Sequence, residues 1–170
     1  MRRLLVLIGL LGLASCARGQ DGTPAALALS SPAFTAGGAI PVRFSAYGAN
    51  RSPPLNWSPM RGARGYALVL DDPDASGGKP FVHWLVWNIP PTKTSLAEGE
   101  ITGIEGTNDA GRRSYFGPRP PSGTHHYHVH VYALDVTLDL AAGADRASLA
   151  RAMNGHVLAV GDMVGIYAAP

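Results

Sequence analysis

Glycine and proline are spread along the whole chain, and they limit what it can fold into. The 170 residues include 21 Gly and 14 Pro, and both residue types interrupt regular backbone structure. Many short strands joined by turns are therefore expected, and long helices are not. Hydrophobic residues make up 46% of the chain and charged residues 15%, which is typical of a folded domain rather than a disordered one. The length suits one domain with a real core.

The spacing of the hydrophobic residues predicts six strands. Residues 66–70 and 81–89 are almost wholly apolar, as expected for strands buried on both faces of a sheet. Residues 40–47 alternate apolar with polar side chains, the period-two pattern of a half-buried strand. Further strands are predicted at residues 27–30, 127–134 and 163–168.

One segment late in the chain has the pattern of a helix. Asp145 is a suitable N-cap, Leu149 and Met153 lie four residues apart on one helical face, and Gly155 provides a stop. There are no repeats and no sign of a second domain. Several short strands with one late helix predict a mainly β fold, a β-sandwich with Greek-key-like connections and one or two short helices.

The first 15 residues have the organisation of a secretory signal peptide. A positively charged start, Met1-Arg2-Arg3, precedes an apolar run at residues 4–13. As a helix this run would extend about 15 Å, roughly half of a bilayer core, so it suits a signal peptide and not a membrane span. The run ends in Leu13-Ala14-Ser15-Cys16, which resembles the bacterial lipobox, where the cysteine receives diacylglycerol before cleavage.

The cysteine count agrees with lipid attachment. Cys16 is the only cysteine, so no intramolecular disulfide can form, and the thiol lies where a lipid would be attached. We expect a signal peptide over residues 1–15, a tether over 16–26 and one domain over 27–170. Ala17 is not the aspartate that often retains lipoproteins at the inner membrane, which favours the outer membrane, facing the periplasm, in a Gram-negative host. The alternatives are an uncleaved amphipathic start and an ordinary secretory signal with a chance cysteine.

The charge balance gives no support to nucleic-acid binding. Arg2 and Arg3 lie in the leader, and the remaining 12 Lys and Arg residues equal the 12 Asp and Glu residues. No basic stripe remains to displace the counterions of a phosphate backbone.

Acidic and imidazole side chains gather at the expected ends of three strands. The run Asp71–Asp74 follows residues 66–70, and His83 lies near the start of the next strand. His125 and Tyr127 are two residues apart, so they share one face of a strand. The Gly/Pro loop before them cannot pair as a central strand, which leaves its amides available to a ligand. Two histidines, a phenol and free amides form a cradle for phosphate or carboxylate, with Asp72 accepting a hydrogen bond from a histidine and favouring the charged imidazole.

Four segments resemble the phosphatidylethanolamine-binding protein family, in its bacterial branch often described as Raf-kinase-inhibitor-like. The segments occur in family order and with near-family spacing, and they are Ser52–Trp57, Asp71–Ala75, His83–Pro90 and Tyr115–Tyr127. The ending Met153–Ala159 is also similar, so the resemblance covers about residues 27–170. It implies a large antiparallel sheet packed on a smaller one, with a pocket for phosphate-like or acetate-like anions at one end.

The resemblance also assigns the pocket residues. They are the acidic Asp72 with Asp74 supporting it, His83, the loop residues Gly117, Pro120 and Pro121, and finally His125 and Tyr127. This chain departs from the family pattern at Ser76, Ala110, Arg119 and His126. Arg119 either adds a cation to the pocket rim or obstructs it.

Three functions follow from these patterns. The first is a non-enzymatic binding module for a small anion or phospholipid headgroup, which also inhibits or regulates a partner protein that the sequence does not identify. The second is a hydrolase using Asp72, His83 and His125, although no Gly-x-Ser-x-Gly nucleophile motif is present. The third is metal binding by the strand that carries His126, His128 and His130, which alternate along one face. The first is preferred, with no cofactor and no metal among the site residues.

Overall fold

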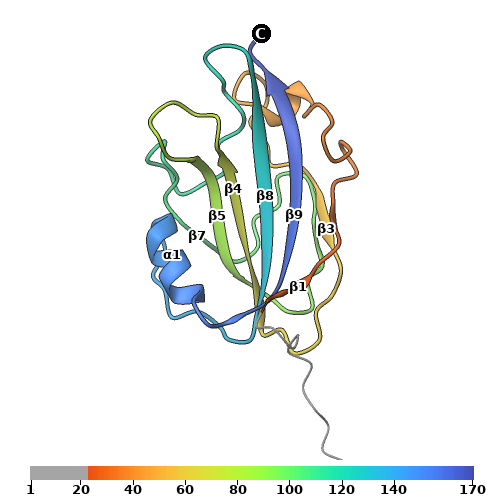
Figure 1. Cartoon of the computed structure of the whole chain (residues 1–170), viewed down its shortest axis with the longest axis vertical. Helices are drawn as coiled ribbons and strands as arrows, with labels where there is room; N and C mark the ends of the chain where they lie inside the picture. The colour runs from red at the N-terminus through yellow and green to blue at the C-terminus, as the bar shows by residue number, and fades with distance from the viewer. Residues whose placement is uncertain (1–22) are drawn as a thin grey trace, which may run out of the picture.

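The computed structural model describes residues 23–170, which form two packed β-sheets (Figure 1). The larger sheet has the strand order β1-β9-β8-β4-β5-β7, and its strands are β1 (Ala25–Ala26), β4 (Gly65–Asp72), β5 (Phe81–Ile89), β7 (Ile104–Glu105), β8 (Thr124–Leu134) and β9 (Val157–Ala168). The smaller sheet contains β2 (Leu29–Ser30), β3 (Leu55–Trp57) and β6 (Ser95–Leu96) in the order β2-β3-β6. The predicted mainly β sandwich of a large and a small sheet is confirmed.

Strands β4 and β5 form the buried centre of the larger sheet. Every residue of β4 is buried, and β5 is buried except for its first and eighth residues. Leu68 and Leu70 pack between the two sheets, while Ala67 and Val69 pack on the opposite face. The nearly continuous apolar runs in the sequence reflect this burial on both faces.

The long strands β8 and β9 pair antiparallel along their whole length. In β8 the buried Tyr127, Val129 and Val131 alternate with side chains that are partly exposed. Strand β9 alternates in the same way, and it includes Gly161 and Gly165 on its buried face. A Cβ at Gly165 would lie 2.6 Å from Ile40 Cγ1 and 2.7 Å from Phe34 Cε2. Glycine is therefore required at position 165, because any side chain there would collide with Phe34 and Ile40, which pack directly against β9.

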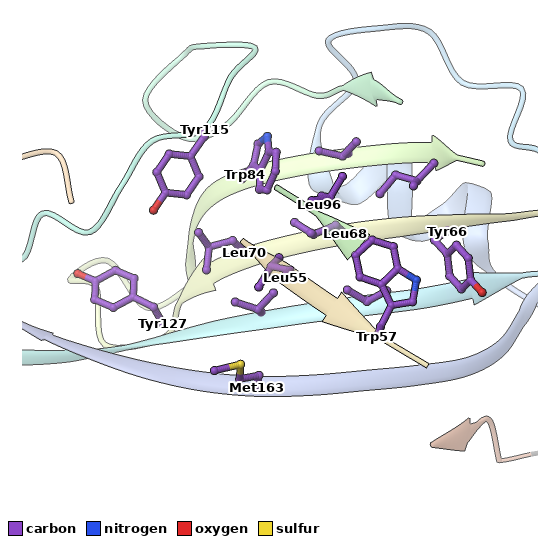
Figure 2. Packing of buried hydrophobic residues seen from close by; sticks show 14 of the residues in the cluster. Leu55, Trp57, Tyr66, Leu68, Leu70, Trp84, Leu96, Tyr115, Tyr127 and Met163 are labelled. Atoms are coloured by element: carbon purple, nitrogen blue, oxygen red, sulfur yellow. The ribbon is translucent and has the colours of Figure 1, made fainter. Parts of the chain in front are cut away.

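The main hydrophobic core lies between the two sheets (Figure 2). Leu55 and Trp57 of β3 and Leu96 of β6 contribute from the smaller sheet, and they pack with Leu68 and Trp84 of the larger sheet. These large side chains are 5% exposed or less. Figure 2 shows that Tyr115 and Tyr127 lie at one end of this core, away from Trp57 and Tyr66.

The other face of the larger sheet is partly covered by the helix α1 (Arg146–Met153), as Figure 1 shows. Leu149 and Met153 bury their side chains in a second cluster with Val69 and Trp87. The Asp145 side chain accepts a hydrogen bond from the Ser148 backbone amide at the start of the helix. The predicted helix, its cap and its buried face are confirmed. Among residues 23–170, no helix is long and apolar enough to cross a membrane.

The prediction of a strand at residues 40–47 is wrong. The segment contains a short 3₁₀ helix, η1 (Val42–Phe44), which begins after Pro41. Phe44 donates its amide to the Pro41 carbonyl at 2.9 Å, and the alternating pattern arises because the helical turn buries Phe44 while Ile40 packs against β9. Two consecutive local hydrogen bonds close this turn, from the Phe44 amide to Pro41 and from the Ser45 amide to Val42, in place of the ladder of a strand.

Several boundaries also differ from the expectations, among them that of β8, which begins at Thr124 rather than at residue 127. The tether was expected to extend to residue 26, but Ala25 and Ala26 form β1 and pair parallel with Ala159 and Val160 of β9. The large sheet is therefore antiparallel except at this edge. The final strand begins at Val157 rather than at residue 163. The prediction missed its first half, where Gly161 and Asp162 interrupt the apolar run. The signal peptide and Cys16 lie outside the described residues.

Candidate functional site

Three strands of the larger sheet bring the predicted site residues to one end of the molecule. Asp72 is the last residue of β4 and pairs with Phe81, the first residue of β5. On the other side of β4, Asp71 pairs with His128 of β8, so Tyr127 lies beside Asp72. His125 contacts Asp72 and His83 contacts Tyr127, although these residues come from three separate segments of the chain.

A β-bulge in β5 positions His83. Leu70 of β4 pairs with Trp84 and Asp71 pairs with Val82, which leaves His83 as an extra residue without a partner in β4. A bulge of this kind redirects a side chain. The His83 ring contacts the Tyr127 ring edge-on, with 5.2 Å between the ring centroids. His83 thus shares the inter-sheet face with its neighbour Trp84, which a regular strand would not allow.

The surroundings of His83 keep its imidazole neutral and fixed in orientation. The Nδ1 atom lies 2.7 Å from the Phe116 carbonyl oxygen, so Nδ1 carries the proton and Nε2 the lone pair. The Phe116 ring stacks on the imidazole at 5.7 Å, and the Phe81 ring lies at 4.9 Å. Burial lowers the pKa of His83 below its ordinary value of 6.5, against the opposing effect of the Phe116 carbonyl.

Asp72 and His125 form a hydrogen-bonded pair that is almost closed to solvent. His125 Nδ1 lies 2.8 Å from Asp72 Oδ2, and the side chains are 13% and 5% exposed. The second carboxylate oxygen, Oδ1, accepts the backbone amide of Asp74 at 2.9 Å. This pairing holds the His125 ring with Nδ1 as the donor and Nε2 as the free nitrogen, as the sequence suggested for Asp72.

Tyr127 places a buried hydroxyl between these groups. Its side chain is fully buried, and its hydroxyl oxygen makes no hydrogen bond of standard geometry within residues 23–170. Burial, followed by the charge of Asp72, raises the pKa of Tyr127, so the phenol stays protonated. A buried hydroxyl that lacks a partner costs about 1–3 kcal/mol, and such groups gather at binding sites.

The loop that contains Gly117 closes the site by packing against the segment after η1. The Gly117 amide donates to Asn50 Oδ1 at 2.7 Å, and Tyr115 donates its hydroxyl to the Phe44 carbonyl at 2.7 Å. A Cβ at Gly117 would lie 2.2 Å from the Phe44 carbonyl oxygen. The expectation that the loop leaves its amides to a ligand is therefore wrong for Gly117, because Asn50 already uses that amide.

The remaining predicted residues lie at the rim. The Asp74 carboxylate binds both the backbone amide and Nδ1 of His126, at 2.8 and 2.7 Å, and that pair is exposed. Pro120 is buried and its carbonyl accepts the Tyr47 hydroxyl at 2.9 Å. Pro121 and Arg119 are exposed. Asp74 supports Asp72 through its backbone, while its side chain is engaged by His126.

Sequence reasoning missed several residues that shape the site. Phe116 and Phe81 enclose the His83 ring. Asn108 is buried and organises the loop, because its Nδ2 donates to the Ser114 carbonyl and its Oδ1 accepts the Ala110 amide. The available signals were that Phe116 lies inside the segment Tyr115–Tyr127 and Phe81 two residues before His83. Nothing in the local sequence around Asn108 indicated its role.

Comparison with known proteins gives a consistent answer. The family model described as phosphatidylethanolamine-binding protein matches residues 30–168. A UPF0098 protein of Methanothermobacter thermautotrophicus is 44% identical over 147 residues, which cover 82% of this chain and 97% of the relative. The Mycobacterium tuberculosis protein named "Putative lipoprotein LppC" is 46% identical over 82% of this chain and 73% of its own length.

Solved structures agree with these sequence matches. The phosphatidylethanolamine-binding protein homologue CT736 of Chlamydia trachomatis superimposes with a TM-score of 0.82 at 36% identity, covering 85% of this chain and 99% of that one. Escherichia coli YbcL, described as a member of the mammalian PEBP family, superimposes with a TM-score of 0.79 at 27% identity over 86% of this chain and all of its own. The fold, the family model and the relatives coincide, and this chain belongs to the phosphatidylethanolamine-binding protein family.

Proposed function

We propose that this protein is a non-enzymatic binding module that takes a small anionic group, a phosphate or phospholipid headgroup, at the site formed by Asp72, His83, His125 and Tyr127. The observation that carries the proposal is the fully buried Tyr127 hydroxyl, which makes no hydrogen bond of standard geometry within residues 23–170, on a ring that contacts the His83 imidazole edge-on. An oxygen of a bound anion would accept this hydroxyl and relieve the cost of its burial.

The charge of the site suits an anion once the histidines are considered together. Asp72 is balanced by His125, and His125 keeps its Nε2 directed away from that pair. Burial lowers the pKa of His83, and its ring gains a second N–H donor when it takes up a proton. The phenol O–H and the imidazole N–H groups then donate hydrogen bonds, and the oxygens of a phosphate or carboxylate can accept them. The Gly117 loop supports this site by shape rather than by donating its own amide.

Calorimetric titration with inorganic phosphate and with phosphoethanolamine tests the proposal. The wild-type protein is expected to bind, and His125→Ala is expected to lose at least about tenfold in affinity, because a charge-assisted hydrogen bond contributes about 1.5–3 kcal/mol. The matched control is His156→Ala, since His156 also pairs with an aspartate, Asp135 at 2.9 Å, but outside the site. A His125→Ala protein that binds as tightly as wild type would falsify this assignment.

The two phosphate ligands also separate a headgroup from a free phosphate. Tighter binding of phosphoethanolamine than of phosphate supports a headgroup, and equal binding supports the phosphate group alone. The same protein, incubated with a panel of esters, tests the non-enzymatic part of the proposal. Turnover that His83→Ala abolishes would show instead that the site is hydrolytic.

We further propose that the chain is an envelope lipoprotein, anchored through Cys16 to the outer membrane and facing the periplasm. The lipobox-like residues 13–16 and the lipoprotein name of the mycobacterial relative support this. Strand β1, which follows the tether, pairs near the start of β9, whereas Tyr127 pairs with Gly165 near its end. The site is thus about 20 Å along the sheet from β1, at the rise per residue of a strand. Mass spectrometry of the mature N-terminus, with Cys16→Ser as control, measures the lipid directly.

A further inference from the structure

A second group of polar side chains lies on the face of the larger sheet opposite Tyr127. His128 and His130 are two residues apart in β8, and their rings stack with 5.9 Å between centroids. In β9, Asp162 pairs directly with His130. One potential ligand atom from each of the three side chains lies within 4.8 Å of the other two. We call these three residues the β8–β9 cluster.

We propose that the β8–β9 cluster binds a divalent transition metal ion through one ring nitrogen of each histidine and a carboxylate oxygen of Asp162. Two imidazoles and one carboxylate suit borderline ions such as Zn²⁺, Cu²⁺ and Ni²⁺, whereas Mg²⁺ and Ca²⁺ prefer ligand sets made of oxygen. Three protein ligands leave at least one coordination position for water or another small ligand.

A buried carboxylate behind the cluster supports this assignment. His130 Nδ1 lies 2.9 Å from Asp162 Oδ1, while its other nitrogen, Nε2, lies 3.7 Å from Asp71 Oδ1. Asp71 is only 4% exposed, and Arg146 of α1 holds it through a 2.9 Å ion pair. A carboxylate facing the second nitrogen is the usual outer partner of a metal-binding histidine, because it fixes the ring orientation and the tautomer.

The scaffold is rigid and the cluster is open to solvent. All three residues lie inside a pair of long strands whose register continues on both sides of the cluster. The His130 and Asp162 side chains are 21% and 55% exposed, so an ion can enter. Within the described part of the chain, the side chain of His128 makes no hydrogen bond, and both of its ring nitrogens remain available for coordination. A site on paired strands needs little rearrangement to take an ion.

The cluster is independent of the proposed anion site. Successive residues of β8 point to opposite faces, so His128 and His130 lie across the sheet from Tyr127, which packs in the inter-sheet core. The sequence offered three alternating histidines without a carboxylate nearby in the chain. The carboxylates come from β9 and β4, 32 and 59 residues away from His130 in numbering, and only the strand order brings them together.

Equilibrium titration of the wild-type protein with Zn²⁺ tests the proposal, with Mg²⁺ as the comparison ion. We expect one Zn²⁺ per chain, no comparable Mg²⁺ binding, and a loss of about tenfold or more in Zn²⁺ affinity for His128→Ala and for the nearly isosteric Asp162→Asn. His156→Ala and His126→Ala are the matched controls. Each removes an imidazole that pairs with an aspartate elsewhere, and each is expected to bind Zn²⁺ as wild type does.

Two further measurements separate a loss of metal coordination from a loss of folding. Titration with Co²⁺ reports coordination through its visible absorption, which is expected in wild type and lost in His128→Ala. Phosphate binding by the same variants shows that they remain folded, because the anion site lies on the other face. Absence of Zn²⁺ binding to a folded wild-type protein overturns the proposal, as does an equal loss of affinity in His128→Ala and His156→Ala.

Discussion

His125 and Asp72 lie 53 positions apart in the chain, yet their side chains meet at 2.8 Å where β4 ends and β8 begins. The pair is 13% and 5% exposed, so solvent screens it little. The 51 residues between the end of β4 and the start of β8 include β5, β6, β7 and the Gly117 loop. The two side chains meet because β4 and β8 are neighbouring antiparallel strands of the sheet, and not because they are close in the sequence.

The Asp72–His125 pair is expected to show strong energetic coupling. His125→Ala leaves the buried Asp72 carboxylate without its partner, which is expected to cost about 2–3 kcal/mol of unfolding free energy. Removing Asp72 as well is expected to restore part of that loss, so the double-mutant cycle gives a coupling of about 1–2 kcal/mol by urea unfolding.

A neighbouring pair provides the control for this cycle. His126 and Asp74 have the same chemistry and a 2.7 Å contact, but their side chains are 54% and 42% exposed. Their cycle is expected to give a much smaller coupling, because water screens exposed charges. Equal coupling in the two cycles would mean that burial does not strengthen the Asp72–His125 pair.

Gly117→Ala is expected to destabilise the protein by about 2 kcal/mol or more, because the new Cβ meets a backbone oxygen that cannot move alone. The clash would also displace Phe116 from the His83 ring and weaken phosphate binding. Ser122→Ala, at an exposed position of the same loop, is expected to change stability by less than about 0.5 kcal/mol. Urea unfolding and calorimetry of both variants test this, and wild-type behaviour of Gly117→Ala contradicts it.

The free energy of unfolding is expected to decrease as the pH is lowered, because of His83. The unfolded chain protonates this histidine near its ordinary pKa of 6.5, whereas burial lowers the pKa in the folded state. The unfolded state therefore binds more protons in this range. The contribution of His83 is fully present above about pH 6.5 and is lost as the pH falls toward the lower folded pKa, by at most about 1.4 kcal/mol per pH unit.

His83→Asn isolates this effect. Asparagine has an N–H that can reach the Phe116 carbonyl, and it has no charge to gain on acidification. The difference in unfolding free energy between wild type and the variant is expected to shrink, or to reverse in favour of the variant, as the pH is lowered from about 8 to about 5. A difference that stays constant across this range would show that His83 does not titrate differently in the two states.

Anion binding is expected to be linked to proton uptake at His83. The bound anion favours the charged imidazole, so its pKa rises when the site fills. Sulfate is a suitable probe because its own charge stays constant between about pH 5 and pH 8. Calorimetry in buffers of different ionisation enthalpy is expected to show net proton uptake for wild type and less for His83→Asn. Binding without proton uptake would indicate that His83 does not contact the anion.

The element types could largely be predicted from the sequence, and the failures have a physical cause. Residues 66–70 and 81–89 are strands because nearly every side chain in them is apolar, and Asp145 caps α1 through a contact only three residues away. The 3₁₀ turn at Val42–Phe44 was misread because its buried Phe44, together with the buried Ile40 that precedes the turn, mimics alternation. Periodicity cannot separate a strand from a short helical turn over so few residues.

The sequence alone placed Asp72, His83, His125 and Tyr127 at the ends of strands, and it identified the segments that resemble the family, because both depend on residues close together in the chain. Strand order and register decided the rest. They made His83 a bulged residue facing Tyr127, brought Asn50 to the Gly117 amide, and placed Asp162 beside His130. These contacts join segments that are distant in sequence, so they exist only when the sheet is assembled and no local pattern encodes them.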